Sequence, residues 1–543
     1  MRTTPAVWFA LLSLVGLFTL LRVDAGMPAS DVATRVDRLL VTELLKDKTN
    51  LAKPADDETF LRRVSLDLTG ELPSLNQMTA YALDPAKDKR AKVVNQLLAD
   101  EKFGQNWGRY WRDVIMYRRT EDRAMIAIPA LEAYLKEELN KGTSWDKIAT
   151  GLITATGNVQ EDGRTAILMA QDGMAEEVAS EVSRIFLGIQ IQCAQCHDHP
   201  TDKWKRQQFH ELASFFPRIA IRRVDDGGKR GFEVVSVNRE RPAGKGGMRK
   251  GSTEHYMPDL KDPSAKGTLT QPKFFVNQQT LSPGMSDAER RDTLAKWLTS
   301  PENPWFAKAF VNRLWAEMVG EGFYEPVDDM GPERQASAPK TIDLLSREFA
   351  SSGYDVKWLF RTITATEAYQ RASRSRRNID ETPFTASCPQ RLRADQLYDA
   401  ILSALGIAEP AATRGGAGAG AGPYARLGGP RQQFAQAFGY DPSDPREEVQ
   451  GGIPQALVMM NSSLINNAIN ASNSRSVLGK LLADTKDNEQ AVAELYLRCL
   501  AREPSKSEKK AALEHISSVK SRNEAFEDLL WALMNSTEFL HRR

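Results

Sequence analysis

Residues 176–200 read EEVASEVSRIFLGIQIQCAQCHDHP, so a helical pattern runs directly into a chemical motif. Apolar side chains recur there at steps of three and four residues, which predicts one buried face of an amphipathic helix. The members of this stripe are Val178, Val182, Ile185, Ile189, Cys193 and Cys196. We therefore expect both thiols to continue the buried face. Pro200 disfavours helix at the residue before it and turns the chain, and a second helix is expected over residues 202–216.

Cys193, Cys196 and His197 form the C-x-x-C-H pattern that is the attachment signature of a c-type haem. Each thiol can add to a vinyl group of the porphyrin, and the adjoining imidazole can bind the iron as its proximal ligand. His199 follows too closely to reach the opposite face of the ring. His210, on the expected returning helix, is a conceivable second axial ligand.

Three other interpretations of the same residues stay open. The cysteines can be small buried hydrophobic residues, which leaves the adjoining histidines unexplained. They can form a short disulfide in an oxidising compartment. Cys193, Cys196, His197 and His199 can also share a zinc ion, although zinc sites usually draw on a second, distant pair of ligands.

The first 25 residues have the pattern of a secretory signal. Arg2 supplies the positive start, Ala6 to Leu21 is an apolar run, and small residues precede a cleavage site after Ala25. An uncleaved membrane anchor is the alternative, because a run of 16 residues is long for the apolar part of a signal sequence, although it is short for a spanning helix. In either case we expect an exported protein located in the periplasm, the cell envelope or the extracellular space.

Composition limits the classes of partner. Lys and Arg number 72 against 71 Asp and Glu, so nothing predicts binding to nucleic acid or to an anionic membrane. Apolar residues make up 41% of the chain, which is enough for real cores. Four cysteines do not make a disulfide scaffold in a chain of 543 residues, but Cys388 and Cys499 could pair with each other.

Periodicity predicts a mainly α protein with two helical domains. The first, bearing the motif, covers residues 26–216, and the second covers 281–543. Between them, residues 217–280 alternate short β-like runs with Gly, Lys and Arg, and predict a β-rich or irregular insert. A Gly/Ala-rich loop is expected near residues 412–430.

Two further groups of residues are interpreted as structural. Trp107, Tyr110 and Trp111 predict core packing, with a platform for haem or sugar as the alternative. Asp328 and Asp329 invite a metal or acid–base role. Adjacent aspartates point in different directions, however, so a loop cap or an arginine partner is favoured.

Motifs along the chain resemble those of the planctomycete-type secreted cytochrome-like proteins, which carry domains of unknown function 1549 and 1553 in tandem. The matching stretches are residues 62–70, 107–113 and 186–200 in the first domain, residues 303–304, 312–315, 328–331 and 391–395 in the second, and residues 461 and 535–540 near the end. The resemblance implies haem at the C-x-x-C-H motif. It also implies an association with sulfatase-like proteins and polysaccharide metabolism. Some relatives have a further N-terminal haem-type domain, whereas this chain has a single such motif.

The function expected from the sequence is a redox or electron-transfer role centred on haem c at Cys193, Cys196 and His197. The partner would be a redox protein or an envelope polysaccharide system. The alternative is a structural or binding protein of the envelope, in which the cluster holds a disulfide, or a metal such as zinc with His199 among its ligands. No residue is assigned a catalytic role, and whether the protein is an enzyme is left open.

Overall fold

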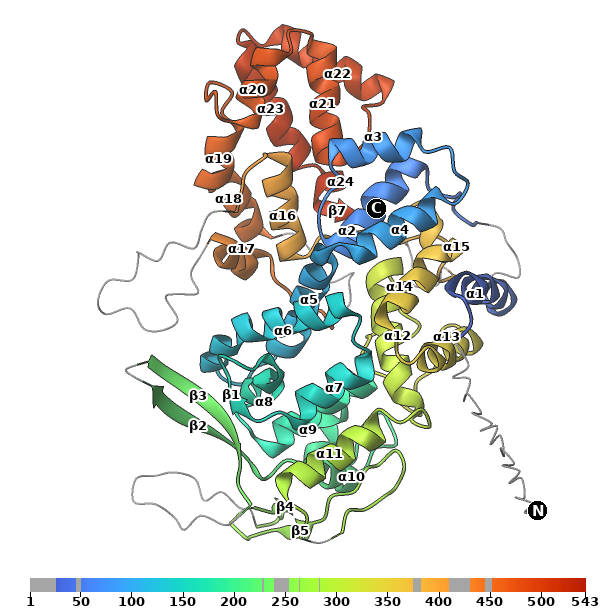
Figure 1. The fold of residues 1–543 in the computed structure, drawn as a ribbon, viewed down its shortest axis with the longest axis vertical. Coiled ribbons are helices and arrows are strands. Elements are labelled where there is room, and N and C mark those ends of the chain that lie inside the picture. The colour runs from blue at the N-terminus through green and yellow to red at the C-terminus, as the bar shows by residue number, and fades with distance from the viewer. Residues whose placement is uncertain are drawn as a thin grey trace, which may run out of the picture.

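The computed structural model in Figure 1 describes most of the chain after residue 25. The described residues are 26–44, 50–226, 229–238, 253–262, 264–282, 284–374, 382–409, 430–444 and 452–543. The predicted signal sequence (residues 1–25) and nearly all of the predicted Gly/Ala-rich loop near 412–430 lie outside them. In the described part of the chain, no helix is both long enough and apolar enough to cross a bilayer.

The prediction of a mainly α protein is confirmed. The helices of the first part are α1 (Ala29–Glu43), α2 (Asp57–Thr69), α3 (Leu75–Leu83), α4 (Lys89–Ala99), α5 (Glu101–Met116), α6 (Ile128–Lys141), α7 (Trp145–Thr154), α8 (Ala166–Ala170), α9 (Ala175–Leu187) and α10 (Arg206–Ala213). Three short 3-10 helices lie among them: η1 (Asp122–Ala127), η2 (Gly163–Thr165) and η3 (Ile191–Gln195).

The second part is also helical. Its helices are α11 (Asp287–Leu298), α12 (Pro304–Val319), α13 (Pro339–Ser351), α14 (Val356–Ala365), α15 (Glu367–Gln370), α16 (Ala394–Ala404), α17 (Pro430–Phe438), α18 (Ile453–Asn461), α19 (Ser463–Ile469), α20 (Val477–Asp484), α21 (Asn488–Leu500), α22 (Lys506–Ser518), α23 (Arg522–Met534) and α24 (Thr537–Leu540). The capping box expected at Ser505 and Glu508 begins α22.

The expected β-containing insert is present between α10 and α11. Its strands are β2 (Ile219–Asp226), β3 (Lys229–Ser236), β4 (His255–Met257) and β5 (Thr268–Thr270). β2 and β3 form an antiparallel hairpin, which β1 (Gly157–Asn158) joins on the β3 edge. β4 pairs with β5, with His255 opposite Thr270. This small ladder brings His255 next to α10 and therefore positions one residue of the site described below.

Buried apolar side chains form two cores. One contains residues from Val32 to Phe384 and therefore joins the motif-bearing helices to α11–α14. The other contains Leu66 and Leu72 of the N-terminal part together with residues 392–539, and it forms the upper part of Figure 1. Because the first core joins residues on both sides of the insert, and the second adds Leu66 and Leu72 to the C-terminal helices, the domain boundaries expected at residues 216 and 281 stay a prediction.

The aromatic cluster of α5 packs in the first core, as predicted. Trp107, Tyr110 and Trp111 are all buried. The ring of Trp111 stacks on Phe310 with centroids 5.5 Å apart and lies 4.3 Å from the centroid of Trp145. Each aromatic pair contributes about 0.5–1.5 kcal/mol beyond the burial of its area. These contacts join α5, α7 and α12, so the rings stabilise the scaffold.

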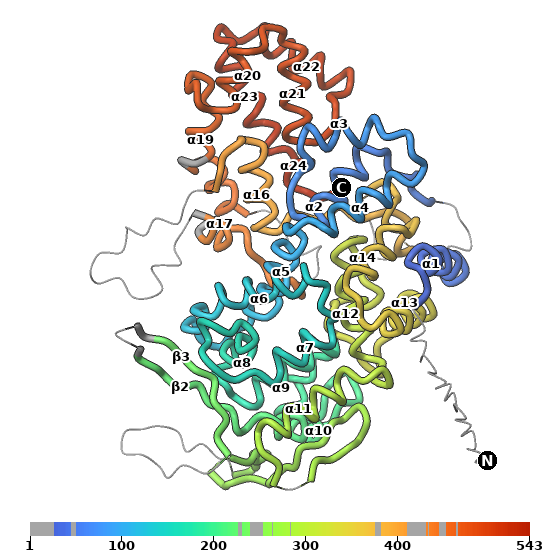
Figure 2. The backbone as a smooth tube through the Cα atoms, viewed as in Figure 1, coloured from blue at the N-terminus to red at the C-terminus, as the bar shows by residue number. Residues whose placement is uncertain are grey.

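Buried ion pairs tie the end of the chain to α2. Asp67 lies 2.6 Å from the guanidinium of Arg542 and accepts a hydrogen bond of 2.7 Å from the Tyr369 hydroxyl. Arg63 donates to the carbonyls of Arg371 and Arg543. Arg542 belongs to β7 (His541–Arg542), and Arg543 follows it directly. β7 pairs with β6 (Gln390–Arg391). The C-terminus accordingly lies inside the outline of the molecule, beside α2 (Figure 2).

Candidate functional site

The C-x-x-C-H motif lies in a loop, residues 188–205, between α9 and α10, which we call the CxxCH loop. The expectation that the α9 helix continues to Cys196 is wrong. Gly188 adopts the left-handed conformation, with φ at 67°. Its N–H bonds the carbonyl of Arg184, and the N–H of Ile189 bonds that of Ser183. Glycine tolerates this conformation at no steric cost, so the helix ends at Leu187, before it reaches Cys193.

Both thiols are exposed, so the prediction that they continue the buried face is also wrong. After the stop, residues 191–195 form η3, in which side chains three residues apart lie on the same side. Ile191 and Ala194 take the buried side of this turn. Cys193 and Cys196 are also three residues apart, and both are exposed free thiols. The interpretation of the cysteines as buried hydrophobic residues therefore fails.

His197 is the histidine of the loop whose Nε2 could act as a metal ligand. Its Nδ1 lies 2.7 Å from the carbonyl oxygen of Asp198, so this nitrogen carries the proton and donates it. Nε2 is then left as the basic nitrogen of an exposed ring. In His199, by contrast, Nδ1 accepts a hydrogen bond of 3.3 Å from the N–H of Thr201. The lone pair of that nitrogen is engaged, and the proton belongs on Nε2.

The Asp198 carboxylate closes the CxxCH loop onto α10. One oxygen accepts from the backbone N–H of Arg206 at 3.0 Å, and the other lies 3.0 Å from the Lys205 ammonium. The Arg206 N–H is one of the unpaired donors at the start of α10. These two contacts lower the pKa of the Asp198 carboxyl. Arg206 also donates from Nε to the carbonyl of Gln195 at 3.2 Å, which fixes the middle of the motif.

Two buried histidines, His210 and His255, support the CxxCH loop from the protein interior. Nε2 of His210 lies 3.0 Å from the Gln195 carbonyl, and its Nδ1 lies 2.8 Å from Nε2 of His255. The carbonyl can only accept, so His210 donates a hydrogen bond from Nε2. Its Nδ1 then accepts a hydrogen bond from the Nε2–H of His255. Nδ1 of His255 then faces Glu176 at 3.7 Å. Burial lowers the pKa of both imidazoles to about 4, and His255 adds to the effect at His210.

This arrangement changes the part expected of His210. Both of its ring nitrogens are engaged in hydrogen bonds, so in this structure it is a support for the loop and not an open ligand. It lies on α10, which covers residues 206–213 of the helix expected over 202–216. His255 was not predicted, because this residue follows in β4, 45 positions after His210, and no motif contains it.

A second loop, residues 326–334, packs against the first, and we call it the DDMG loop after Asp328 to Gly331. The amide N–H of Met330 donates to the carbonyl of Gly188 at 2.7 Å. A Cβ on Gly331 would lie 2.0 Å from a carboxylate oxygen of Asp202, so the two loops approach each other closely here and a larger residue would force the Asp202 side chain to move. Arg334 donates to the Thr201 hydroxyl at 3.0 Å. The two loops therefore form a single unit.

Asp328 anchors the DDMG loop in the protein interior and confirms the expected arginine partner. Its carboxylate is fully buried. It lies 3.2 Å from Arg184 and 3.3 Å from Arg313, and accepts from the amide of Gln190 at 2.8 Å. Burial alone raises the pKa of a carboxyl, but the charges of Arg313 and Arg184 outweigh this effect and lower the pKa of Asp328 to about 2. Asp329 pairs with Arg334 at 3.0 Å.

The donor set of the CxxCH loop contains the groups that covalent haem attachment uses. In the described part of the chain, no three His, Cys, Asp or Glu side chains converge where they could hold one metal ion. Cys193, Cys196, His197 and His199 thus form no closed tetrahedral site. Haem attachment needs two accessible thiols and one basic imidazole nitrogen, and Cys193, Cys196 and His197 have these properties.

The disulfide considered between Cys388 and Cys499 is not formed, because Cys499 is a free thiol. Its side chain is fully buried, and burial raises its pKa to about 12. A thiol of this kind is protonated at neutral pH and is a poor nucleophile. Cys499 therefore differs from the two exposed thiols of the CxxCH loop.

Comparison with known proteins assigns both loops to domain families. Residues 35–220 match the family model PSCyt2, protein of unknown function (DUF1549), and residues 290–427 match PSD1, protein of unknown function (DUF1553). No curated protein and no solved structure matches the chain. The CxxCH loop belongs to the first matched segment and the DDMG loop to the second. Their contact is thus one place where the two segments meet.

Proposed function

Because the chain belongs to the family in which DUF1549 and DUF1553 domains occur in tandem, we propose that it is an exported c-type haem protein with a redox or electron-transfer role. Cys193 and Cys196 would hold the haem by thioether bonds, and His197 would be the proximal ligand. Bound haem supplies one-electron chemistry between ferric and ferrous iron. The partner would be a redox protein outside the cytoplasm, and a link to polysaccharide metabolism is part of the same proposal.

One observation carries this proposal: two exposed thiols, Cys193 in η3 and Cys196 directly after it, lie next to an imidazole whose Nε2 is basic. Exposure is what the attachment chemistry requires, because both sulfur atoms must reach the vinyl groups. The hydrogen bond from Nδ1 of His197 to the Asp198 carbonyl fixes the ring tautomer, as outer partners do for metal-bound histidines.

The surrounding residues would act by holding the loop in place. His210 and Arg206 both donate to the carbonyl of Gln195, which lies between the two cysteines in the motif. The DDMG loop supports the start of the CxxCH loop through Met330 and Asp328. A preorganised loop of this kind loses little conformational entropy when a cofactor is attached.

The test is expression in a host that has c-type cytochrome maturation machinery. We expect a colour that survives acid–acetone extraction and haem-linked peroxidase staining of the denatured chain. The Cys193→Ala/Cys196→Ala variant should lose both signals, and the Cys388→Ala variant, which leaves the motif intact, should keep them. A folded, colourless wild-type protein would refute the haem proposal. If that protein contained one zinc per chain, the alternative of a metal-bearing binding protein of the cell envelope would replace it.

Mass spectrometry of the exported protein tests the export part separately. We expect the mature chain to begin at Gly26 or within a few positions of it, since the small residues before this point fit a cleavage site. A chain with an intact Met1 in the membrane fraction would instead indicate an uncleaved anchor.

A further inference from the structure

A cavity of about 1060 Å³ opens in the C-terminal part of the molecule, between α16, α17, α18 and α19 and beside the segment before α20. These helices lie at the end of the molecule opposite α9 and α10, so the cavity is separate from the CxxCH loop (Figure 1). Its volume is at the upper end of the range of about 300–1,000 Å³ that is typical of small-molecule sites.

One part of the cavity wall is apolar. It includes Ile401, Leu405, Phe434 and Ile465, and Leu457 of α18 extends it to the surface. α18 has the sequence IPQALVMMN, which contains no charged residue. Three of its side chains, spaced four and three residues apart, are strongly exposed: Ile453 at 77%, Leu457 at 51% and Met460 at 55%. Contiguous exposed apolar surface of this kind is typical of a binding site.

The polar residues of the cavity favour a negative ligand. Asn461, Asn467, Asn473 and Arg475 line it, and none of its lining residues is acidic. Arg475 is exposed, and within the described residues no carboxylate forms an ion pair with its guanidinium. The side-chain amides can donate hydrogen bonds beside this charge. An apolar trough next to one cation and several amide donors complements a molecule with an apolar body and an anionic end.

We propose that this cavity binds an amphiphile with a single hydrocarbon chain and an anionic head group. The chain would lie among Ile401, Phe434 and Ile465, and the head would contact Arg475. The proposal uses no residue of the CxxCH loop, so it stands or falls independently of the haem.

Straight-chain carboxylates provide the first test. Octanoate, decanoate and dodecanoate, each below its critical micelle concentration, should displace the fluorescent probe N-phenyl-1-naphthylamine from the full chain. Each added methylene should strengthen binding about fourfold, because burying it is worth about 0.8 kcal/mol. An affinity that does not change with chain length would overturn the proposal. So would displacement seen only after residues 411–428 are deleted, since the chain itself would then be the occupant.

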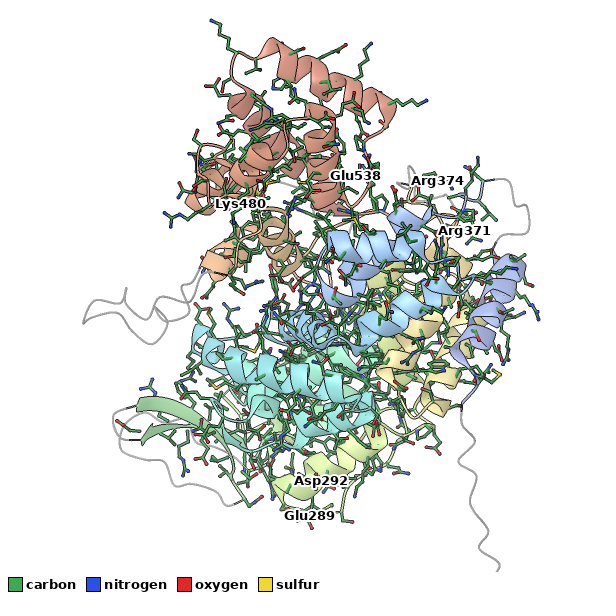
Figure 3. The ribbon with its side chains drawn as sticks, turned by 45° about the horizontal axis from the view of Figure 1, so that its top comes forward. Glu289, Asp292, Arg371, Arg374, Lys480 and Glu538 are labelled. Carbon is green, nitrogen blue, oxygen red and sulfur yellow. The ribbon has the colours of Figure 1, made fainter. Side chains whose placement is uncertain are left out.

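Matched variants test the head group. Arg475→Gln should weaken dodecanoate binding about two- to fivefold, as expected for an exposed ion pair, and leave binding of neutral dodecanol unchanged. Lys480→Gln is the control: this residue, labelled in Figure 3, lies on α20 outside the cavity lining and carries the same charge. Leu457→Gln should weaken both ligands, since it removes apolar wall from an exposed position. Equal effects of Arg475→Gln and Lys480→Gln on dodecanoate would refute recognition of an anionic head.

Discussion

The CxxCH loop and the DDMG loop touch each other but differ in how their polar groups are used. In the DDMG loop, the Asp328 carboxylate is buried and fully partnered by two arginines and an amide. In the CxxCH loop, two thiols are exposed and free, and the basic nitrogen of His197 faces solvent. Partnered groups stabilise a fold, whereas reactive groups left open are available for chemistry. This difference is why we propose a functional role for the CxxCH loop and a scaffolding role for the DDMG loop.

Removing the Asp328 carboxylate should give the largest effect on stability. Asp328→Ala leaves the buried Arg313 without this carboxylate partner, whereas Arg184 keeps its ion pair with Glu181, and the loss costs about 3–5 kcal/mol in the free energy of unfolding. Asp329→Ala breaks a half-exposed pair with Arg334 and should cost less than about 1 kcal/mol. Urea denaturation of both variants measures the difference. Equal losses would mean that burial does not distinguish the two aspartates.

Acid should weaken the support beneath the CxxCH loop. The pKa values of His210 and His255 are lowered from 6.5 to about 4 in the folded protein. As the pH falls, these imidazoles therefore bind a proton in the unfolded chain before they do so in the folded chain. Their stabilising contribution is complete above pH 6.5 and is lost as the pH falls toward 4, by up to about 3 kcal/mol per imidazole.

The double variant His210→Gln/His255→Gln should therefore show a flatter dependence of unfolding free energy on pH between 6.5 and 4. His515→Gln is the control, because this histidine is exposed and pairs only with Asp528. It should keep the wild-type slope. A slope that is unchanged in the double variant would show that the buried pair does not titrate as described.

The contact between the two loops can be tested at Gly331. Gly331→Ala places a methyl group against the Asp202 carboxylate and should cost about 1–3 kcal/mol. In an Asp202→Ala background the obstacle is absent, so the same substitution should cost clearly less. A double-mutant cycle of unfolding free energies measures this coupling. Additive effects would mean that the loops do not pack as closely as the structure shows.

The smallest effect is expected at the exposed thiols. Cys193→Ala/Cys196→Ala should change the stability of the haem-free protein by less than about 0.5 kcal/mol, because surface positions contribute little. Cys499→Ser introduces a hydroxyl at a fully buried position and should cost about 1–3 kcal/mol. Thermal unfolding of both proteins provides the comparison. A large loss in the double variant would make the motif cysteines part of the scaffold.

The sequence predicted the helical class, the β-containing insert and the packing of the α5 aromatics, because each depends on local periodicity or composition. It failed where one residue interrupts a pattern: Gly188 ends α9, so the apolar stripe no longer describes Cys193 and Cys196. That glycine is itself a helix-stop signal.

Long-range partners were not predictable from local patterns. Arg184 is 144 residues from Asp328, and His255 approaches His210 only because β4 folds back onto α10. An arginine partner for Asp328 was expected by type, since a buried carboxylate needs one, but its identity required the fold. The support beneath the motif depends on the same kind of tertiary contact.

The pyridine haemochrome spectrum of protein matured in a cytochrome-c-competent host, combined with metal analysis, tests the central claim most directly. The account predicts one iron and one covalently bound haem per chain, lost when Cys193 and Cys196 are replaced by alanine. A folded wild-type protein without haem, colourless and carrying zinc or no metal, would contradict it.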